Sequence, residues 1–176
     1  MIFEDSPLKD LTILVVDDEP DILDAVGDEL EMCLVHKASD YETALQYLLG
    51  YKYDVVILDV MGVNGFELLR VSVSQGFPTV MFTAYALTID ALKKSIQLGA
   101  VFFLPKDKLP ELKDFLEKFV LDRWKSNWMG FFDRLGVYFN KHFGPAWKEK
   151  DKFFHEFEES FMEAKKEEKS LGNRKR

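Results

Sequence analysis

The chain has 176 residues, of which 47% are hydrophobic and 31% charged, so it suits one ordinary domain with an appendage and is not a disordered chain. The formal net charge of −8 is unevenly spread: residues 1–120 hold 10 Lys+Arg and 21 Asp+Glu, whereas residues 121–176 hold 13 and 10. An acidic first part repels phosphate backbones, so nucleic-acid binding is not expected.

Two further features indicate where the protein works. No apolar run approaches the ~18 residues that a membrane-spanning helix needs, and the N-terminus MIFEDSPLKD lacks the basic region of a secretion signal. The single cysteine, Cys33, has no partner for an internal disulfide, which favours a reducing compartment. We therefore expect a cytoplasmic protein.

Apolar runs and segments with helical spacing alternate along the chain. In chain order, we predict a strand at 11–16, a helix at 20–33, a weaker strand at 34–38, a helix at 40–49, a strand at 54–59, a helix at 65–75, a strand at 78–83, a helix at 88–98, a strand at 101–105 and a helix from near Lys108. Continuous apolar runs are typical of strands that are buried on both faces. The alternation predicts an α/β fold with a five-stranded, doubly wound parallel sheet.

Polar residues stand where these strands end. Asp17 and Asp18 follow the first strand, Asp59 ends the third, Thr83 ends the fourth, and Lys106 follows the fifth. In open parallel sheets, ligands bind beyond the carboxyl ends of the strands. Three carboxylates, a hydroxyl and an ammonium are therefore expected in one crevice.

This group of side chains suits phosphoryl transfer. Clustered carboxylates repel one another, and a divalent cation such as Mg²⁺, which prefers oxygen ligands, relieves that repulsion. Asp59 can then act as a carboxylate nucleophile that forms an acyl phosphate, with Lys106 and Thr83 stabilising the transferred group. Taken singly, each residue has a simpler interpretation, such as Asp18 capping the helix that begins at Pro20. The five residues together favour a phosphoryl-transfer site over these simpler interpretations.

Residues 8–122 resemble a response-regulator receiver domain of two-component signalling, which has a flavodoxin-like fold. The resemblance is carried by ILVVDDEPDILDAV, VHKASDYETAL, YDVVILDVM, PTVMFTAY and GAVFFLPK. It implies that Asp59 is the phosphorylation site and that Thr83 and Lys106 bind the phosphoryl oxygens. It also implies a Mg²⁺ site and a switch: the metal would be held by Asp17, Asp18, Asp59 and the backbone carbonyl of Met61, and the switch would use Thr83 and Phe103.

The resemblance further implies partners. A sensor histidine kinase or a phosphotransfer protein would donate the phosphoryl group, and a downstream protein would read the result. The chain would be a switch that catalyses only its own phosphorylation and dephosphorylation. A phosphatase of similar topology would need a second Asp two residues after the nucleophile, where this chain has Met61, which cannot move a proton.

Two departures from the family pattern affect the site. The loop after Asp59 lacks the usual proline and reaches its glycine two residues early, which keeps open a degenerate receiver that acts as a scaffold. Asp107 replaces the proline that usually follows the lysine, so no cis peptide is expected there. Met61 and Tyr85 occupy the family positions that border the hydrolytic water, and their bulk predicts a long-lived phosphorylated state.

The tail matches no output domain, DNA-binding domains included. We predict a helical hairpin at 123–170 and disorder at 171–176. A coiled-coil-like seam spaced 3, 4, 3, 4, 3 could continue the preceding helix: Leu121, Trp124, Trp128, Phe131, Leu135 and Tyr138. A second seam follows Gly144-Pro145: Phe154, Phe157, Phe161 and Ala164. The tail could pack on itself or on the receiver, dock a protein or form a homodimer, or, less favoured, adapt the protein to a membrane surface.

Overall fold

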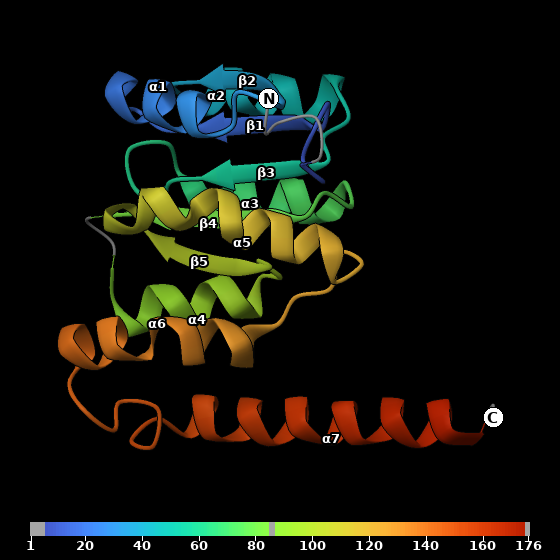
Figure 1. Cartoon of the computed structure of the whole chain (residues 1–176). Coiled ribbons are helices and arrows are strands. Elements are labelled where there is room, and N and C mark those ends of the chain that lie inside the picture. Colours follow the sequence, from blue (N-terminus) through green and yellow to red (C-terminus); the bar gives the residue numbers. More distant parts are fainter. Residues whose placement is uncertain (1–5, 85–86, 175–176) are drawn as a thin grey trace. The chain divides into compact units, whose positions relative to one another are not determined.

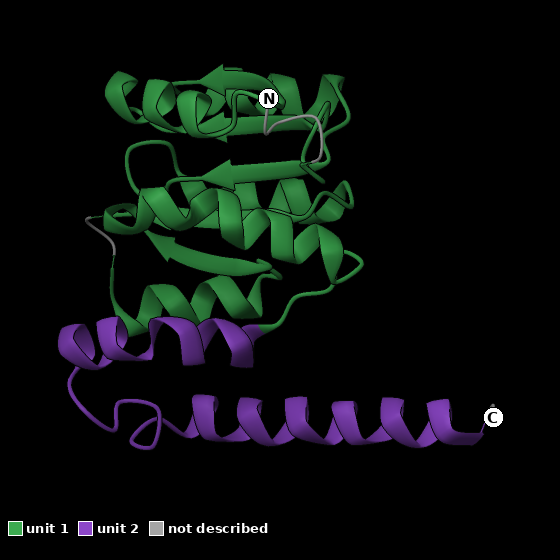
Figure 2. Cartoon of the chain, in the orientation of Figure 1, with its two compact units in different colours: residues 1–127 green, residues 128–176 purple. Residues whose placement is uncertain are grey.

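The structure is a computed structural model that describes residues 6–84 and 87–174. It divides into two compact units, residues 1–127 and residues 128–176, coloured green and purple in Figure 2. The first contains the sheet, and the second contains the two C-terminal helices.

Five parallel strands form one sheet in the order β2-β1-β3-β4-β5 (Figure 1). The strands are β1 (Thr12–Val16), β2 (Leu34–Ala38), β3 (Val55–Leu58), β4 (Thr79–Thr83) and β5 (Phe102–Pro105). Every residue of β3, β4 and β5 is buried, as expected for strands covered on both faces. The predicted doubly wound parallel sheet is therefore confirmed, including the weaker strand β2.

Five helices cover the sheet: α1 (Pro20–Glu29), α2 (Tyr41–Gly50), α3 (Gly65–Ser74), α4 (Ile89–Gln97) and α5 (Leu109–Leu121). Side-chain caps fix two of the starting points. Asp40 accepts a hydrogen bond from the Thr43 N–H at 2.8 Å, and Thr88 accepts one from the Ala91 N–H at 3.0 Å. A side-chain cap holds the first turn of a helix in place. Asp40 and Thr88 therefore also hold the ends of the loops that lead from the preceding strands into these helices.

The helices lie in two layers. Helices α1 and α5 pack together on one face of the sheet, and α2 packs beside α3 on the other (Figure 1). Helix α4 contacts β5, and the Lys94 ammonium lies 4.6 Å from the centroid of the Phe66 ring, which ties α4 to α3. The core between the layers is apolar and includes Leu14, Ile57 and Phe103, none of them more than 1% exposed.

Helix α1 begins at Pro20 as predicted, but its last residue and its N-cap residue differ from the prediction. It stops at Glu29 rather than at residue 33, and its N-cap residue is Glu19 rather than Asp18. Glu19 takes that place because its backbone N–H is held at 2.9 Å by Oδ1 of Asp17. Asp18 is thereby left free of a capping role and stands exposed at the end of β1.

The suggestion that α5 continues into the tail is wrong. Helix α5 ends at Leu121, and Asp122 is its C-cap residue. The two residues that follow, Arg123 and Trp124, have φ angles of 61° and 62°. A left-handed backbone cannot continue a right-handed helix. The Trp124 ring instead packs edge-on against Phe119, at 5.6 Å between centroids, so the first unit extends past the predicted boundary at residue 122.

The second unit consists of α6 (Trp128–Phe143) and α7 (Lys152–Arg174), which run antiparallel (Figure 2). Residues 171–174, predicted to be disordered, belong to α7. The buried face of α6 is wider than the predicted seam, because it includes Phe132 and Phe139. Trp147, from the connecting segment, lies against Phe132, Phe139 and Phe154, with centroid distances of 5.8, 5.9 and 4.9 Å. This aromatic cluster joins the two helices at one end.

Among the described residues, the search for a membrane-spanning helix finds none that is both long and apolar enough.

Candidate functional site

The polar residues predicted to converge do so at one end of the sheet. Asp17 follows β1, Asp59 follows β3, Thr83 ends β4, and Lys106 follows β5. The Asp59 N–H donates to the Val16 carbonyl at 3.0 Å, which extends the β1–β3 ladder by one residue and holds Asp59 beside Asp17. On the other side, Thr83 is paired in register with Pro105, the residue before Lys106. The strand pairing therefore brings these four residues to one place.

Lys106 is the centre of the site. Its ammonium nitrogen lies 2.7 Å from Oδ2 of Asp17, 3.0 Å from Oδ2 of Asp59 and 3.3 Å from Oε1 of Glu19. The Lys106 and Asp59 residues are 9% and 4% exposed, and Asp17 is 1% exposed. Buried charges are tolerated only when paired, so the ammonium and the two aspartates depend on one another.

Burial and charge act against each other at this cluster. Burial raises the pKa of the Asp17 carboxyl, and the negative charge of Asp59 adds to that rise, although Lys106 and the Glu19 N–H oppose it. Burial alone would lower the pKa of Lys106, but its hydrogen bonds to Asp17 and Asp59 and their charges outweigh burial and raise that pKa. The lysine therefore stays charged throughout the physiological range, whereas the acidic side of the site carries excess negative charge.

Glu19 is a member of the site that sequence reasoning missed. Its backbone N–H holds Asp17, and its half-exposed carboxylate is the third counter-ion of Lys106. The signal was present as a third acidic residue directly after Asp17-Asp18. Glu19 was assigned no role from the sequence, because strand-end position alone does not distinguish it from an ordinary residue before a helix.

The site also holds unused hydrogen-bonding capacity. Among the described residues, Oδ1 of Asp59 and Oγ1 of Thr83 are buried and have no hydrogen-bond partner. Such atoms are uncommon in folded proteins, because an unpaired buried polar atom costs about 1–3 kcal/mol. These two buried oxygens therefore could bond a group that this part of the chain does not itself provide.

Four carboxylates could hold a cation here. One oxygen from each of Asp17, Asp18, Glu19 and Asp59 lies within 4.8 Å of the others. Oxygen ligands of this kind fit a hard divalent cation such as Mg²⁺. The donor set therefore matches the metal expected from the sequence, with Asp18 as its exposed member.

The short loop between β3 and α3 depends on two glycines. Gly62 has a φ angle of +83°, and a Cβ atom on it would overlap the Asp18 carboxylate. A Cβ atom on Gly65 would overlap the carbonyl oxygen of Asp59. The two missing side chains let the β3–α3 loop approach the Asp18 carboxylate and the Asp59 backbone closely.

Two further predicted site residues, Phe103 and Met61, differ in exposure. The Phe103 side chain is fully buried in β5, and the Met61 side chain is 54% exposed. Tyr85, predicted to narrow the approach to the site, lies outside the described residues. No cis peptide occurs in the described part of the chain, as expected from Asp107 after Lys106.

The model of the response regulator receiver domain matches residues 13–117, which is more than half of the chain. The chain belongs to the response regulator receiver domain family. The matched range begins in β1 and ends within α5, so it contains every residue of the site described above. Receiver domains are generally phosphoacceptor switches that use Mg²⁺ in an acidic pocket and interact with histidine kinases or phosphotransfer proteins.

Several known proteins share this receiver domain. The chain is 32% identical over 127 residues to protein-glutamate methylesterase/protein-glutamine glutaminase 2 of Shewanella sp. (strain MR-4), covering 66% of this chain and 36% of that protein. It is 29% identical over 108 residues to the Fimbriae Z protein of Salmonella typhimurium, covering 57% and 51%. The chain thus spans about half or less of the length of these curated relatives.

Solved structures give the same assignment. The crystal structure of the response regulator DrrB, a Thermotoga maritima OmpR/PhoB homologue, superimposes with a TM-score of 0.58 at 27% identity, covering 66% of this chain and 55% of that one. The match therefore covers about two thirds of this chain and about half of that one.

Proposed function

We propose that this response regulator accepts a phosphoryl group on Asp59. The observation that carries the proposal is the asymmetry of that carboxylate. Its Oδ2 is 3.0 Å from the Lys106 ammonium, whereas its buried Oδ1 has no hydrogen-bond partner among the described residues. One oxygen is thus positioned by a permanent positive charge, and the other has its lone pairs available for attack on phosphorus.

In the proposed step, an Asp59 oxygen bonds to phosphorus while the bond between phosphorus and the donor's imidazole nitrogen breaks. The electron pair of the broken bond stays on that nitrogen. Lys106 lies close enough to follow the charge onto the phosphoryl oxygens, and the Thr83 hydroxyl, which has no partner of its own in the described chain, can donate to one of them.

The residues that would hold Mg²⁺ are Asp18 and Asp59, with Asp17 nearby and the backbone carbonyl of Met61 as a further ligand. When bound, the ion supplies positive charge to the phosphoryl oxygens. Replacing Asp18 with Ala should weaken Mg²⁺ binding about tenfold or more, as measured by calorimetry, while the fold remains intact because Asp18 is exposed and caps no helix. Unchanged affinity would remove Asp18 from the metal site.

The proposed response passes through Thr83 and Phe103 to a protein partner. Thr83 ends β4, and β4 is paired with β5, where Phe103 lies opposite Met81. A hydroxyl that turns toward the phosphoryl group vacates space beside its strand, and the buried Phe103 ring is positioned to adjust to that space. The donor would be a histidine kinase or a phosphotransfer protein, and the output would be a protein contact on the receiver face or on the α6–α7 tail rather than DNA binding.

The second candidate function is a scaffold that never takes up phosphoryl. The shortened β3–α3 loop and the three carboxylates that already surround Lys106 are the features that favour it. In this case the aromatic tail would carry the whole activity, through a protein or a membrane surface.

One experiment separates these two functions. The full-length protein is incubated with a small phosphodonor and Mg²⁺, and its intact mass is measured. The proposed function predicts the addition of one phosphoryl mass, its loss in Asp59→Asn, and its retention in Asp24→Asn, a matched change at an exposed aspartate of α1. Absence of labelling in the wild-type protein, or full labelling of Asp59→Asn, would reject Asp59 as the acceptor and leave the scaffold.

A further inference from the structure

Helix α7 carries an apolar stripe that extends well beyond its contact with α6. At 3.6 residues per turn, five apolar residues share one side of the helix: Phe154, Phe157, Phe161, Ala164 and Leu171. Only Phe154 is buried, and Leu171 is 61% exposed. Because most helical stability in proteins comes from packing of such a face, the exposed remainder of the stripe is suited to a partner.

The inner end of the stripe is already occupied within the second unit. The Phe132 and Trp147 rings contact Phe154, and the Lys148 ammonium pairs with Oε1 of Glu158 at 2.9 Å. Farther along, Phe157 and Phe161 lie next to each other at 6.4 Å between centroids and are half-buried. The part of α7 available to another molecule therefore begins near Phe157.

The two halves of α7 carry opposite charge. Residues 152–163 hold one Lys and four Glu, whereas residues 164–174 hold four Lys+Arg and two Glu. This order also suits the helix dipole, so it does not by itself indicate a partner. The placement beside the stripe is more specific. Glu158 and Lys165 are seven residues apart and flank the stripe on the same side.

We propose that two copies of this chain pair through α7 in antiparallel orientation. The acidic first half of one helix then faces the basic second half of the other, and Glu158 meets Lys165 of the second copy twice by symmetry. The bulky Phe161 lies opposite the small Ala164. A parallel pair would instead set Phe161 against Phe161. It would also place Glu158 of one copy on the opposite flank from Lys165 of the other, which combines poor packing with loss of the charge pairs.

This pairing rests on the proposed docking role of the tail, and it does not depend on phosphorylation of Asp59. A membrane surface is a weaker candidate for the occupant of the stripe, because α7 as a whole holds five Lys+Arg and six Glu and does not attract anionic lipid.

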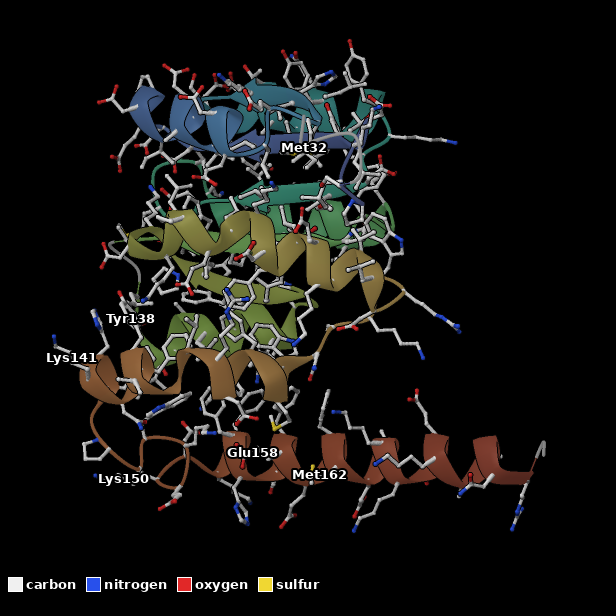
Figure 3. The ribbon with its side chains drawn as sticks, in the orientation of Figure 1. Met32, Tyr138, Lys141, Lys150, Glu158 and Met162 are labelled. Carbon is white, nitrogen blue, oxygen red and sulfur yellow. The ribbon has the colours of Figure 1, made fainter. Side chains whose placement is uncertain are left out.

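Glu158 and Met162 are labelled on α7 in Figure 3. Met162 is 55% exposed and lies beside the stripe rather than within it.

The test uses charge exchange in the full-length protein, followed by sedimentation velocity from ~5 to ~500 µM. The wild type should dimerise with increasing concentration, and more weakly at high salt. Glu158→Lys and Lys165→Glu should each weaken self-association about tenfold, because an attractive contact becomes repulsive. Mixing the two variants should restore dimers, since the first helix then carries Lys and the second Glu at both positions.

The control is Lys166→Glu, which makes the same charge change on the opposite side of the helix and should leave association unchanged. Rescue by mixing also excludes misfolding of Glu158→Lys through loss of the Lys148 pair, because a misfolded variant cannot be rescued by its counterpart. A full-length protein that stays monomeric at ~500 µM, a mixture without dimers, or a control that weakens equally would overturn the pairing and assign the stripe to a different protein. Phosphodonor labelling of the same samples reports separately on Asp59.

Discussion

Gly62 lies directly against the carboxylate of Asp18, so closely that a Cβ atom on residue 62 would occupy the same space as that carboxylate. The absence of a side chain at Gly62 therefore allows the Asp18 carboxylate to occupy its position. This relationship links the unusual short loop to the acidic group of the site, and it leads to a direct test.

Replacing Gly62 with Ala should displace Asp18 and lower the affinity for Mg²⁺ about tenfold, as measured by calorimetry. The matched control is Gly76→Ala, because Gly76 has a φ angle of +82°, close to the +83° of Gly62, but open space where its Cβ would be. Both variants should lose about 1 kcal/mol of stability from backbone strain. Equal Mg²⁺ affinities in the two variants would show that the contact with Asp18 is unimportant.

Replacing Lys106 with Met should lower the free energy of unfolding of the metal-free protein by about 3 kcal/mol, because two buried aspartates lose their counter-ion. Denaturant titration in the presence of a chelator measures this change in the free energy of unfolding. The lysine pKa is raised on folding, so its stabilising contribution is fully present below pH 10.5, the ordinary value, and is lost only as pH rises through the higher folded pKa. As a control, Lys37→Met removes an exposed pair with Asp24 and should cost less than about 1 kcal/mol. A similar loss in both variants would contradict the buried network.

The pH dependence of stability should reveal the strain on Asp17. Burial raises its folded pKa above 3.8, so the charged form costs stability at neutral pH, and this cost disappears as pH falls through the folded pKa toward 3.8. In the presence of a chelator, the stability of the wild type relative to Asp17→Asn should therefore increase as the pH falls through that window. Asp40 should behave in the opposite way. Hydrogen bonds from Thr43 lower its pKa, so its contribution is present above 3.8 and is lost as pH falls through the folded value. Parallel curves for Asp17→Asn and wild type would count against the assignment.

The lifetime of the phosphorylated state should be long and should shorten when Met61 is replaced by Asn. Hydrolysis needs a water in line with phosphorus, and an apolar Met61 cannot orient one, whereas an amide can. The measurement is the decay of the phosphoryl mass after removal of the donor. Met32→Asn, which lies outside the site, should decay at the wild-type rate. Decay of the wild type within seconds, or no acceleration in Met61→Asn, would refute this role.

Much of this structure follows from local sequence patterns. Uninterrupted apolar strands and capped helices predicted the sheet, and polar residues at strand ends predicted the convergence of Asp17, Asp59 and Lys106. The helix that ends at Leu121 was harder to predict, because the 3, 4, 3 spacing through Trp124 is equally periodic on either side of a left-handed turn. Packing of Trp124 on Phe119, which is not encoded in the spacing, ended the helix.

Other features of the site depend on contacts that spacing cannot show. The role of Glu19 arises from a hydrogen bond between its own N–H and Asp17, which moves the helix cap by one residue and frees Asp18. The contribution of Gly62 is visible only when its neighbour in space is known. Both are three-dimensional consequences of short polar segments, where periodicity provides no information.

The position of Lys106 on the last strand has a consequence for synthesis of the protein. Asp17 and Asp59 leave the ribosome early, but the ammonium that neutralises them belongs to a segment that follows β5, and β5 is the edge strand added last in sequence. Until that segment docks, burial of the two aspartate charges is unfavourable, because their counter-ion is missing. Packing of the earlier strands around them is therefore disfavoured. An unfinished chain therefore lacks the ammonium on which the proposed acceptor site depends.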